Sequence, residues 1–134
     1  MTAPQNHPKP RITPTGRPFW DALRRGEVHI QRCGACGHYL FYPRVICPDC
    51  SSRDLAWTPV SGRGVLYTYT VTEPGKGSRG GDILAIVELD EGVRMATTLV
   101  GIDPDAVEVG MPVEPVFDNA SFEDVTLLRF RPAP

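Results

Sequence analysis

The four cysteines of the chain occur as two C-x-x-C pairs that are separated by only ten residues. They lie in the segment RCGACGHYLFYPRVICPDC, residues 32–50, at Cys33, Cys36, Cys47 and Cys50. Each C-x-x-C turn presents two sulfurs, and two turns complete the tetrahedral set of thiolates that zinc prefers at structural sites. The spacing therefore predicts one metal site with these four ligands, with zinc ahead of iron.

The predicted metal is structural, because a shell closed by four cysteines leaves no open position for water or substrate. His38 lies beside the first pair and could replace a ligand, but four thiolates already suffice, so we expect a surface residue. A cytosine-deaminase site also uses C-x-x-C, but it needs an upstream H-x-E motif. The residues two positions after His7 and His29 are Lys9 and Gln31, not glutamate, so this kind of site is excluded.

The bulk composition predicts a cytoplasmic protein of one domain or two small ones. The 134 residues are 41% hydrophobic, which is enough for a modest core. No apolar stretch approaches the about 20 residues of a membrane span, and MTAPQNHPKPRITPTGRP lacks the apolar core of a secretory signal. In a reducing compartment, paired cysteines more often bind a metal than form disulfides.

Charge is unevenly distributed along the chain. Residues 1–50 contain seven Lys/Arg and three Asp/Glu, a balance of +4, whereas residues 51–134 contain seven and thirteen, a balance of −6. Nucleic-acid affinity comes largely from Lys and Arg that neutralise phosphates, so the acidic second part disfavours that function.

The sequence of the N-terminal part predicts an arm followed by a short helix. Residues 1–17 are rich in proline and poor in apolar side chains, which predicts a flexible arm. Residues 18–26 have a proline suited to the first turn, an apolar face and a terminating glycine. On this helix Phe19 and Trp20 must pack against the chain's own body or another subunit, and we predict that they contact a partner.

The sequence pattern of the rest of the chain predicts mainly strands. Residues 27–33 predict a strand, because Val28, Ile30 and Arg32 alternate with Glu27, His29 and Gln31. Residues 55–60 predict an edge strand or a strand end. Five further strands follow, at 64–73, 82–89, 93–100, 112–117 and 124–130, with a helical turn at Asp103 between the third and fourth. This is the order of an OB-fold, a five-stranded Greek-key barrel, although another small barrel or a sandwich would fit the same count.

Two features of this region invite a functional interpretation. On the first barrel strand, Val65, Tyr67, Tyr69 and Val71 share one face, which we assign to the barrel interior rather than to base stacking. The segment EPGKGSRGGD, 73–82, joins two strands and is therefore a hairpin loop rather than a P-loop. Its cations, Lys76 and Arg79, are candidates for contacting an anionic ligand or a partner.

No catalytic residue is predicted. The chain has three histidines, placed in the arm, in a strand and beside a cysteine pair, so no Ser-His-Asp or Cys-His set can be argued.

The order of these motifs resembles the family called domain of unknown function 35. The resemblance runs from Phe19 to about Phe130 and rests on the helix, both cysteine pairs, the SGRG entry to the barrel and VGMPV before its fourth strand. It implies a mainly β protein with a helix and rubredoxin-like zinc ribbon at 18–60 and an OB-fold at 61–134. The glycine-rich loop departs from the longer apolar and proline-containing segment of many members.

The resemblance also implies a function. Members are small non-catalytic partners of acyl-CoA enzymes, and they help to hold the CoA portion of the substrate. Their partners are thiolases, lipid-transfer-protein-like aldolases of steroid side-chain degradation and polyketide-type acyltransferases. As a fused domain, they also accompany enoyl-CoA hydratases. Our leading hypothesis is an accessory subunit of a thiolase-fold aldolase or thiolase. A single-stranded nucleic-acid-binding module and a stand-alone acyl-CoA-binding protein are the alternatives.

Overall fold

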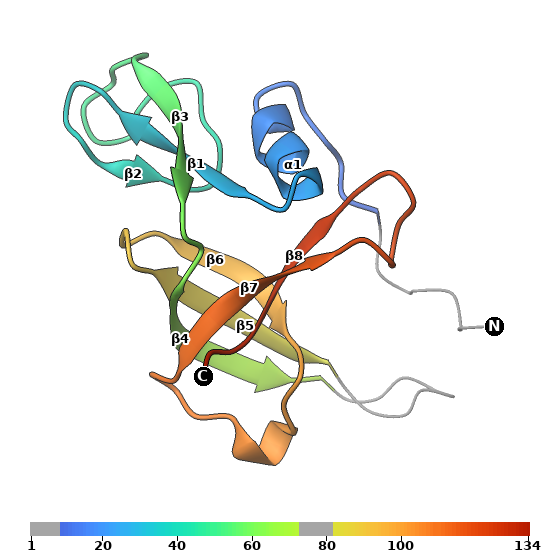
Figure 1. Cartoon of the computed structure of the whole chain (residues 1–134). Helices are drawn as coiled ribbons and strands as arrows, with labels where there is room; N and C mark the ends of the chain where they lie inside the picture. The colour runs from blue at the N-terminus through green and yellow to red at the C-terminus, as the bar shows by residue number, and fades with distance from the viewer. Residues whose placement is uncertain (1–8, 73–81) are drawn as a thin grey trace.

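The computed structural model of the chain describes residues 9–72 and 82–134 and shows a mainly β protein (Figure 1). A three-stranded sheet and a closed five-stranded barrel follow one N-terminal helix. The elements are α1 (Arg17–Arg24), β1 (Val28–Cys33), β2 (Tyr39–Leu40), β3 (Leu55–Val60), β4 (Gly64–Val71), β5 (Ile83–Leu89), β6 (Arg94–Leu99), the 3-10 turn η1 (Pro104–Ala106), β7 (Pro112–Asp118) and β8 (Leu127–Pro132).

Helix α1 forms where the sequence predicts a helix, although it ends at Arg24, two residues before the predicted glycine. A proline lies in its first turn, and Gly26 follows it with φ +78°. Isolated helices of this length are marginal in water, so burial of Phe19, Ala22 and Leu23 stabilises it. No helix in the described ranges is long and apolar enough to cross a membrane.

The small sheet has the order β2-β1-β3, and all of its pairs are antiparallel. The predicted alternation along β1 holds for Val28 and Ile30 but fails further on, because Gln31 is buried and Arg32 is exposed. The Gln31 amide donates to the carbonyl oxygen of Arg44 at 2.8 Å and accepts from its N–H at 2.7 Å. Burial of this polar side chain is possible because both ends of the amide are hydrogen-bonded.

The barrel confirms the OB-fold. Its strand order is β4-β5-β6-β8-β7, and β7 pairs with β4 to close it. The turn η1 lies between the third and fourth barrel strands, and the Asp103 carboxylate accepts from the N–H of Asp105 at 2.9 Å. The last strand begins three residues later than predicted, at Leu127, although Val125 and Thr126 are buried ahead of it.

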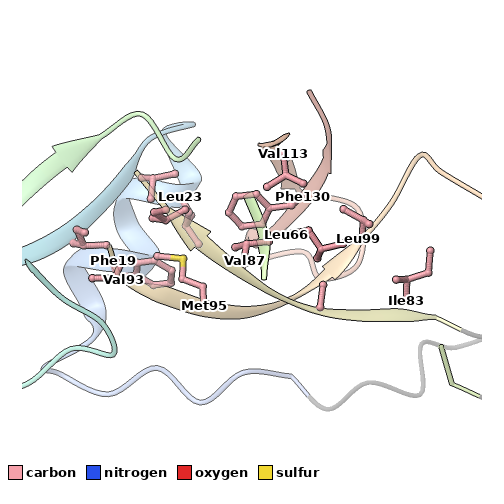
Figure 2. Close-up of a cluster of buried hydrophobic side chains, with 14 of the residues drawn as sticks. Phe19, Leu23, Leu66, Ile83, Val87, Val93, Met95, Leu99, Val113 and Phe130 are labelled. Atoms are coloured by element: carbon pink, nitrogen blue, oxygen red, sulfur yellow. The ribbon is translucent and has the colours of Figure 1, made fainter. Parts of the chain in front are cut away.

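The principal core runs from the helix through β1 into the barrel. Figure 2 shows Phe19 and Leu23 of α1 near Met95, with Val87 and Phe130 in the barrel. A second cluster, in the cysteine segment, consists of Cys33, Leu40 and Cys47 with Leu55 packed against it. The segment between the cysteine pairs therefore has little apolar burial of its own.

The prediction for the first barrel strand is wrong. Val65, Tyr67 and Val71 are exposed by 41%, 46% and 43%, and Tyr69 is only half-buried. The residue of this strand that points fully into the core is Leu66.

The physical reason lies in the register of β4 against β5. Leu66 pairs with the buried Val87, and the register shifts between Leu66 and Thr68, as at a β-bulge. A strand with apolar residues on both faces does not reveal which face is inside, so the neighbouring strand decides. Tyr67 instead lies outside, with the Arg94 guanidinium carbon 3.9 Å from its ring centroid.

Gly64 offers a test of this packing. A Cβ at this position would overlap the carbonyl of Glu88 on β5, so we expect Gly64→Ala to reduce the free energy of unfolding by about 1–3 kcal/mol. Urea denaturation measures the change. Thr70→Ala, an exposed position on the same strand, is the control and should stay within about 0.5 kcal/mol of the parent. An equally small loss for Gly64→Ala would contradict the close approach of the two strands.

Candidate metal centre and the helix–barrel junction

The four cysteines converge at the end of the small sheet. Their sulfurs lie within 4.8 Å of one another, with Cys33–Cys50 at 3.5 Å and Cys36–Cys47 at 3.7 Å. Four sulfurs each about 2.3 Å from a zinc ion in a regular tetrahedron are about 3.8 Å apart, so the cluster fits zinc closely. The structure therefore supports the predicted site, with four cysteines positioned to bind one structural zinc ion.

The two cysteine turns are built alike. The N–H of Gly37 donates to the carbonyl of Cys33 at 2.8 Å, and the N–H of Ser51 donates to the carbonyl of Cys47 at 2.9 Å. Gly37 and Ser51 both have positive φ, +81° and +65°. The glycine adopts this conformation at little cost, so the pattern C-G-A-C-G suits the first turn.

Without a cation, Cys33 and Cys50 differ widely in their pKa. The backbone N–H of Cys36 contributes most to lowering the pKa of Cys33 to about 6. At Cys50 the N–H of Ser52 favours the thiolate, but the neighbouring thiols, Cys33 first, together with burial, raise the pKa to about 12. A fully deprotonated set requires a positive ion at its centre, so metal binding must release protons.

His38 is exposed beside the cluster, as the sequence predicts. Its Nδ1 lies 3.4 Å from the sulfur of Cys36 and 3.2 Å from a carboxylate oxygen of Asp49. Because four sulfurs already form the cluster, His38 is placed to donate to a bound thiolate rather than to replace one.

The helix meets the cysteine-containing part of the chain through aromatic rings. Phe19 is only 4% exposed, and its centroid lies 5.3 Å from those of Trp20 and Phe41. Phe19 therefore packs against the chain's own body, which is one of the two destinations expected for these side chains. Trp20 is half-buried, and its Nε1 atom is buried without a hydrogen-bond acceptor among the described residues.

Sequence reasoning missed several residues of this junction. The alternation along the strand predicts a polar-face position for Gln31, and Phe41 gives no signal beyond being apolar. Arg129 also gave none, although only 16% of its side chain is exposed and its Nε donates to Asp118 at 2.7 Å. Lys76 and Arg79, the predicted loop contacts, lie outside the described residues.

The arrangement defines a class of protein, an OB-fold barrel joined to a rubredoxin-like zinc ribbon. Two family models match, described as "ChsH2, rubredoxin-like zinc ribbon domain" over residues 20–56 and "ChsH2, C-terminal OB-fold domain" over residues 57–118. The chain belongs to the DUF35 family, as its sequence suggested.

Similar proteins have related names. A "DUF35 domain-containing scaffold protein" of Methanothermobacter thermautotrophicus is 35% identical, with 79% of this chain and 83% of the relative covered. A "Probable enoyl-CoA hydratase alpha subunit" of Thermomonospora curvata is 38% identical over 94% of this chain, which spans only 40% of that relative's length.

A solved structure extends the similarity to three dimensions. It is described as "Ltp2-ChsH2(DUF35) aldolase", and its matching chain is 36% identical with a TM-score of 0.84. The match covers 94% of this chain and 100% of that one.

We predict that the purified protein contains one zinc ion per chain and that Cys47→Ser loses it. Metal analysis and thermal unfolding measure this; the melting temperature should fall because metal binding contributes folding free energy. Zinc affinity should also weaken as the pH falls, since protons compete for the thiolates. His38→Ala is the matched control and should keep the metal. A metal-free parent protein with unchanged stability would refute the structural role.

Proposed function

We propose that the chain is a non-catalytic accessory subunit that binds and completes a thiolase-fold acyl-CoA enzyme of the aldolase or thiolase type. The observation that carries the proposal is the match of 94% of this chain to the whole of one chain in a solved structure whose name combines an aldolase with a DUF35 component. The scaffold names of family relatives support the same role.

The chemistry of the described residues is in keeping with an accessory role. The closed thiolate set leaves the metal no position for substrate. His38 contacts Cys36, but that sulfur belongs to the metal cluster. His29 pairs with Glu27, with Nε2 2.8 Å from the carboxylate oxygen, at the surface. Catalysis would then belong to the partner.

The loop between the two cysteine pairs is the surface that we infer to contact the partner. Tyr42, Val45 and Ile46 are exposed by 45%, 57% and 41%, although all three are large and apolar. We call these three residues the ribbon patch. Clustered apolar side chains on a surface are typical of protein interfaces. The zinc site holds both ends of this loop, so the metal would position the contact; Trp20 is the second predicted contact.

Co-purification from the native host tests the proposal. We expect a thiolase-fold enzyme to be recovered with the tagged full-length chain and identified by mass spectrometry. Recovery of an enoyl-CoA hydratase subunit would keep the accessory role and refute the thiolase-fold partner. Full acyl-CoA turnover by this chain alone would refute the accessory role.

A variant of the ribbon patch tests the interface. Val45→Glu should reduce the recovered partner about tenfold, since burying an unpaired charge costs more than about 1.4 kcal/mol. Val109→Glu is the matched control, because Val109 is 64% exposed and lies between η1 and β7. Metal analysis should show one zinc in both variants. Equal recovery of the partner with both would place the interface elsewhere.

One observation favours the competing function of nucleic-acid binding. Tyr67 is exposed on the barrel with Arg94 over its ring, a pairing that can also stack bases. However, residues 51–134 have a charge balance of −6, and Arg94 is also paired with Glu88 at 3.0 Å.

We therefore expect no salt-sensitive binding of a fluorescent single-stranded oligonucleotide, as measured by anisotropy. Saturable binding that weakens with salt and is lost in Tyr67→Ala would favour the nucleic-acid function instead.

A further inference from the structure

The four metal ligands differ in how far solvent reaches them. Cys33 and Cys47, the first residue of each pair, are each 1% exposed and belong to the small apolar cluster of the cysteine segment. Cys50, the last ligand, is exposed, and Cys36 is at least partly exposed. A small reagent dissolved in water therefore has its most open approach to the cluster at Cys50.

The surroundings of Cys50 keep that approach open. Residues 48–51 are all exposed and lie outside any helix or strand. The apolar cluster of the cysteine segment consists of Cys33, Leu40 and Cys47 with Leu55, and Cys50 does not belong to it. Apolar packing thus protects two ligands of the site and leaves Cys50 at the surface.

A second sulfur lies beside that of Cys50. The sulfurs of Cys33 and Cys50 are 3.5 Å apart, which is closer than the 3.7 Å between those of Cys36 and Cys47. A cysteine that is oxidised to sulfenic acid condenses with a neighbouring thiol to form a disulfide. Cys33 is therefore the residue placed to react with an oxidised Cys50.

Metal binding keeps the ligand sulfurs in their reactive form. A coordinated cysteine is deprotonated, and the thiolate is the nucleophilic form of the side chain. Oxidation of cysteine requires both thiolate character and exposure. Cys50 has both, whereas Cys33 and Cys47 have thiolate character in the metal site without exposure.

We propose that Cys50 is an oxidation site for hydrogen peroxide, and that condensation of the product with Cys33 releases the zinc ion. The Cys50 thiolate attacks one peroxide oxygen and the O–O bond breaks, which gives a sulfenic acid and hydroxide. The Cys33 thiolate then attacks the Cys50 sulfur and the S–O bond breaks, which gives a disulfide and a second hydroxide. Two electrons pass from the two sulfurs to one peroxide molecule, and the hydroxides take protons from solvent to become water.

Loss of two ligands would dismantle the metal site. Cys36 and Cys47 remain, whereas a structural zinc site needs four ligands. The cysteine segment has little apolar burial of its own, so the loop with the ribbon patch would lose order with the metal. A partner bound to that patch would be released. This last consequence rests on the proposed function, whereas the oxidation site does not.

Peroxide titration of the zinc-loaded full chain tests the oxidation site. A chromogenic zinc chelator follows the release of metal, and alkylation with mass spectrometry counts the remaining thiols. We expect one zinc ion to be released for every two thiols lost, and dithiothreitol with added zinc to restore the parent protein. Retention of zinc at a peroxide concentration that fully oxidises the metal-free chain would overturn the proposal.

Peptide mapping identifies the disulfide. Trypsin cleaves after Arg44, between the two pairs, so a disulfide between Cys33 and Cys50 joins the peptides 33–44 and 45–53. Fragmentation of the joined peptides assigns the two linked cysteines. A first disulfide between any other two cysteines would overturn the proposal.

Two histidine variants connect the reaction to Cys50. Histidine is a zinc ligand that cannot form a disulfide, so Cys50→His and Cys36→His should each keep one zinc ion. Peroxide should release zinc about tenfold more slowly from Cys50→His than from the parent, and from Cys36→His at close to the parental rate. Equal rates in the two variants would overturn the assignment to Cys50. If either variant fails to bind zinc, the disulfide map of the parent decides.

The outcomes separate this inference from the accessory role. If a partner co-purifies but peroxide leaves the zinc in place, the oxidation site alone is refuted. If peroxide releases zinc through a disulfide between Cys33 and Cys50 but no partner is recovered, the accessory role fails and the oxidation site stands.

Discussion

Convergence of four thiolates on one ion is the constraint on which the cysteine-containing part of this protein depends. Its own apolar cluster consists of Cys33, Leu40 and Cys47 with Leu55, too little to order a segment with so little regular structure. Two of those buried side chains are themselves metal ligands, so the site is part of the small core. Zinc thus replaces hydrophobic burial and positions the loop that carries the ribbon patch.

The ribbon is joined to the barrel by a continuous core. Helix α1 contributes Phe19 and Leu23, β1 contributes Val28 and Ile30, and all four belong to the same cluster as the barrel interior. A helix of eight residues gains its stability from that packing. The helix, β1 and the barrel therefore stabilise one another through one core, and Cys33 at the end of β1 connects that core to the metal site.

The helix–barrel junction contains a cavity of about 410 Å³. In the barrel, β6 and β8 share one register pair, Leu99 with Phe130, and residues of both strands line this cavity. Phe19, Trp20 and Phe41 line the cavity, and the buried Nε1 of Trp20 has no acceptor among the described residues.

Some of this structure could be predicted from local patterns, whereas the rest depended on contacts between distant segments. The two C-x-x-C pairs predict the metal site because a ligand turn is a local structure, and Asp103 followed by proline predicts the turn before β7 for the same reason. The pattern fails at Val65 and Tyr67, because the pairing of β4 with β5 decides which face is inside. The sequence by itself determined the metal ligands, the short helix and the order of strands, since each depends on residues a few positions apart. Only the tertiary structure decided the burial of Gln31 and the cavity at the helix–barrel junction. Strand pairing and helix packing there bring together side chains of α1, the loop between the cysteine pairs, β6 and β8, which no local spacing connects.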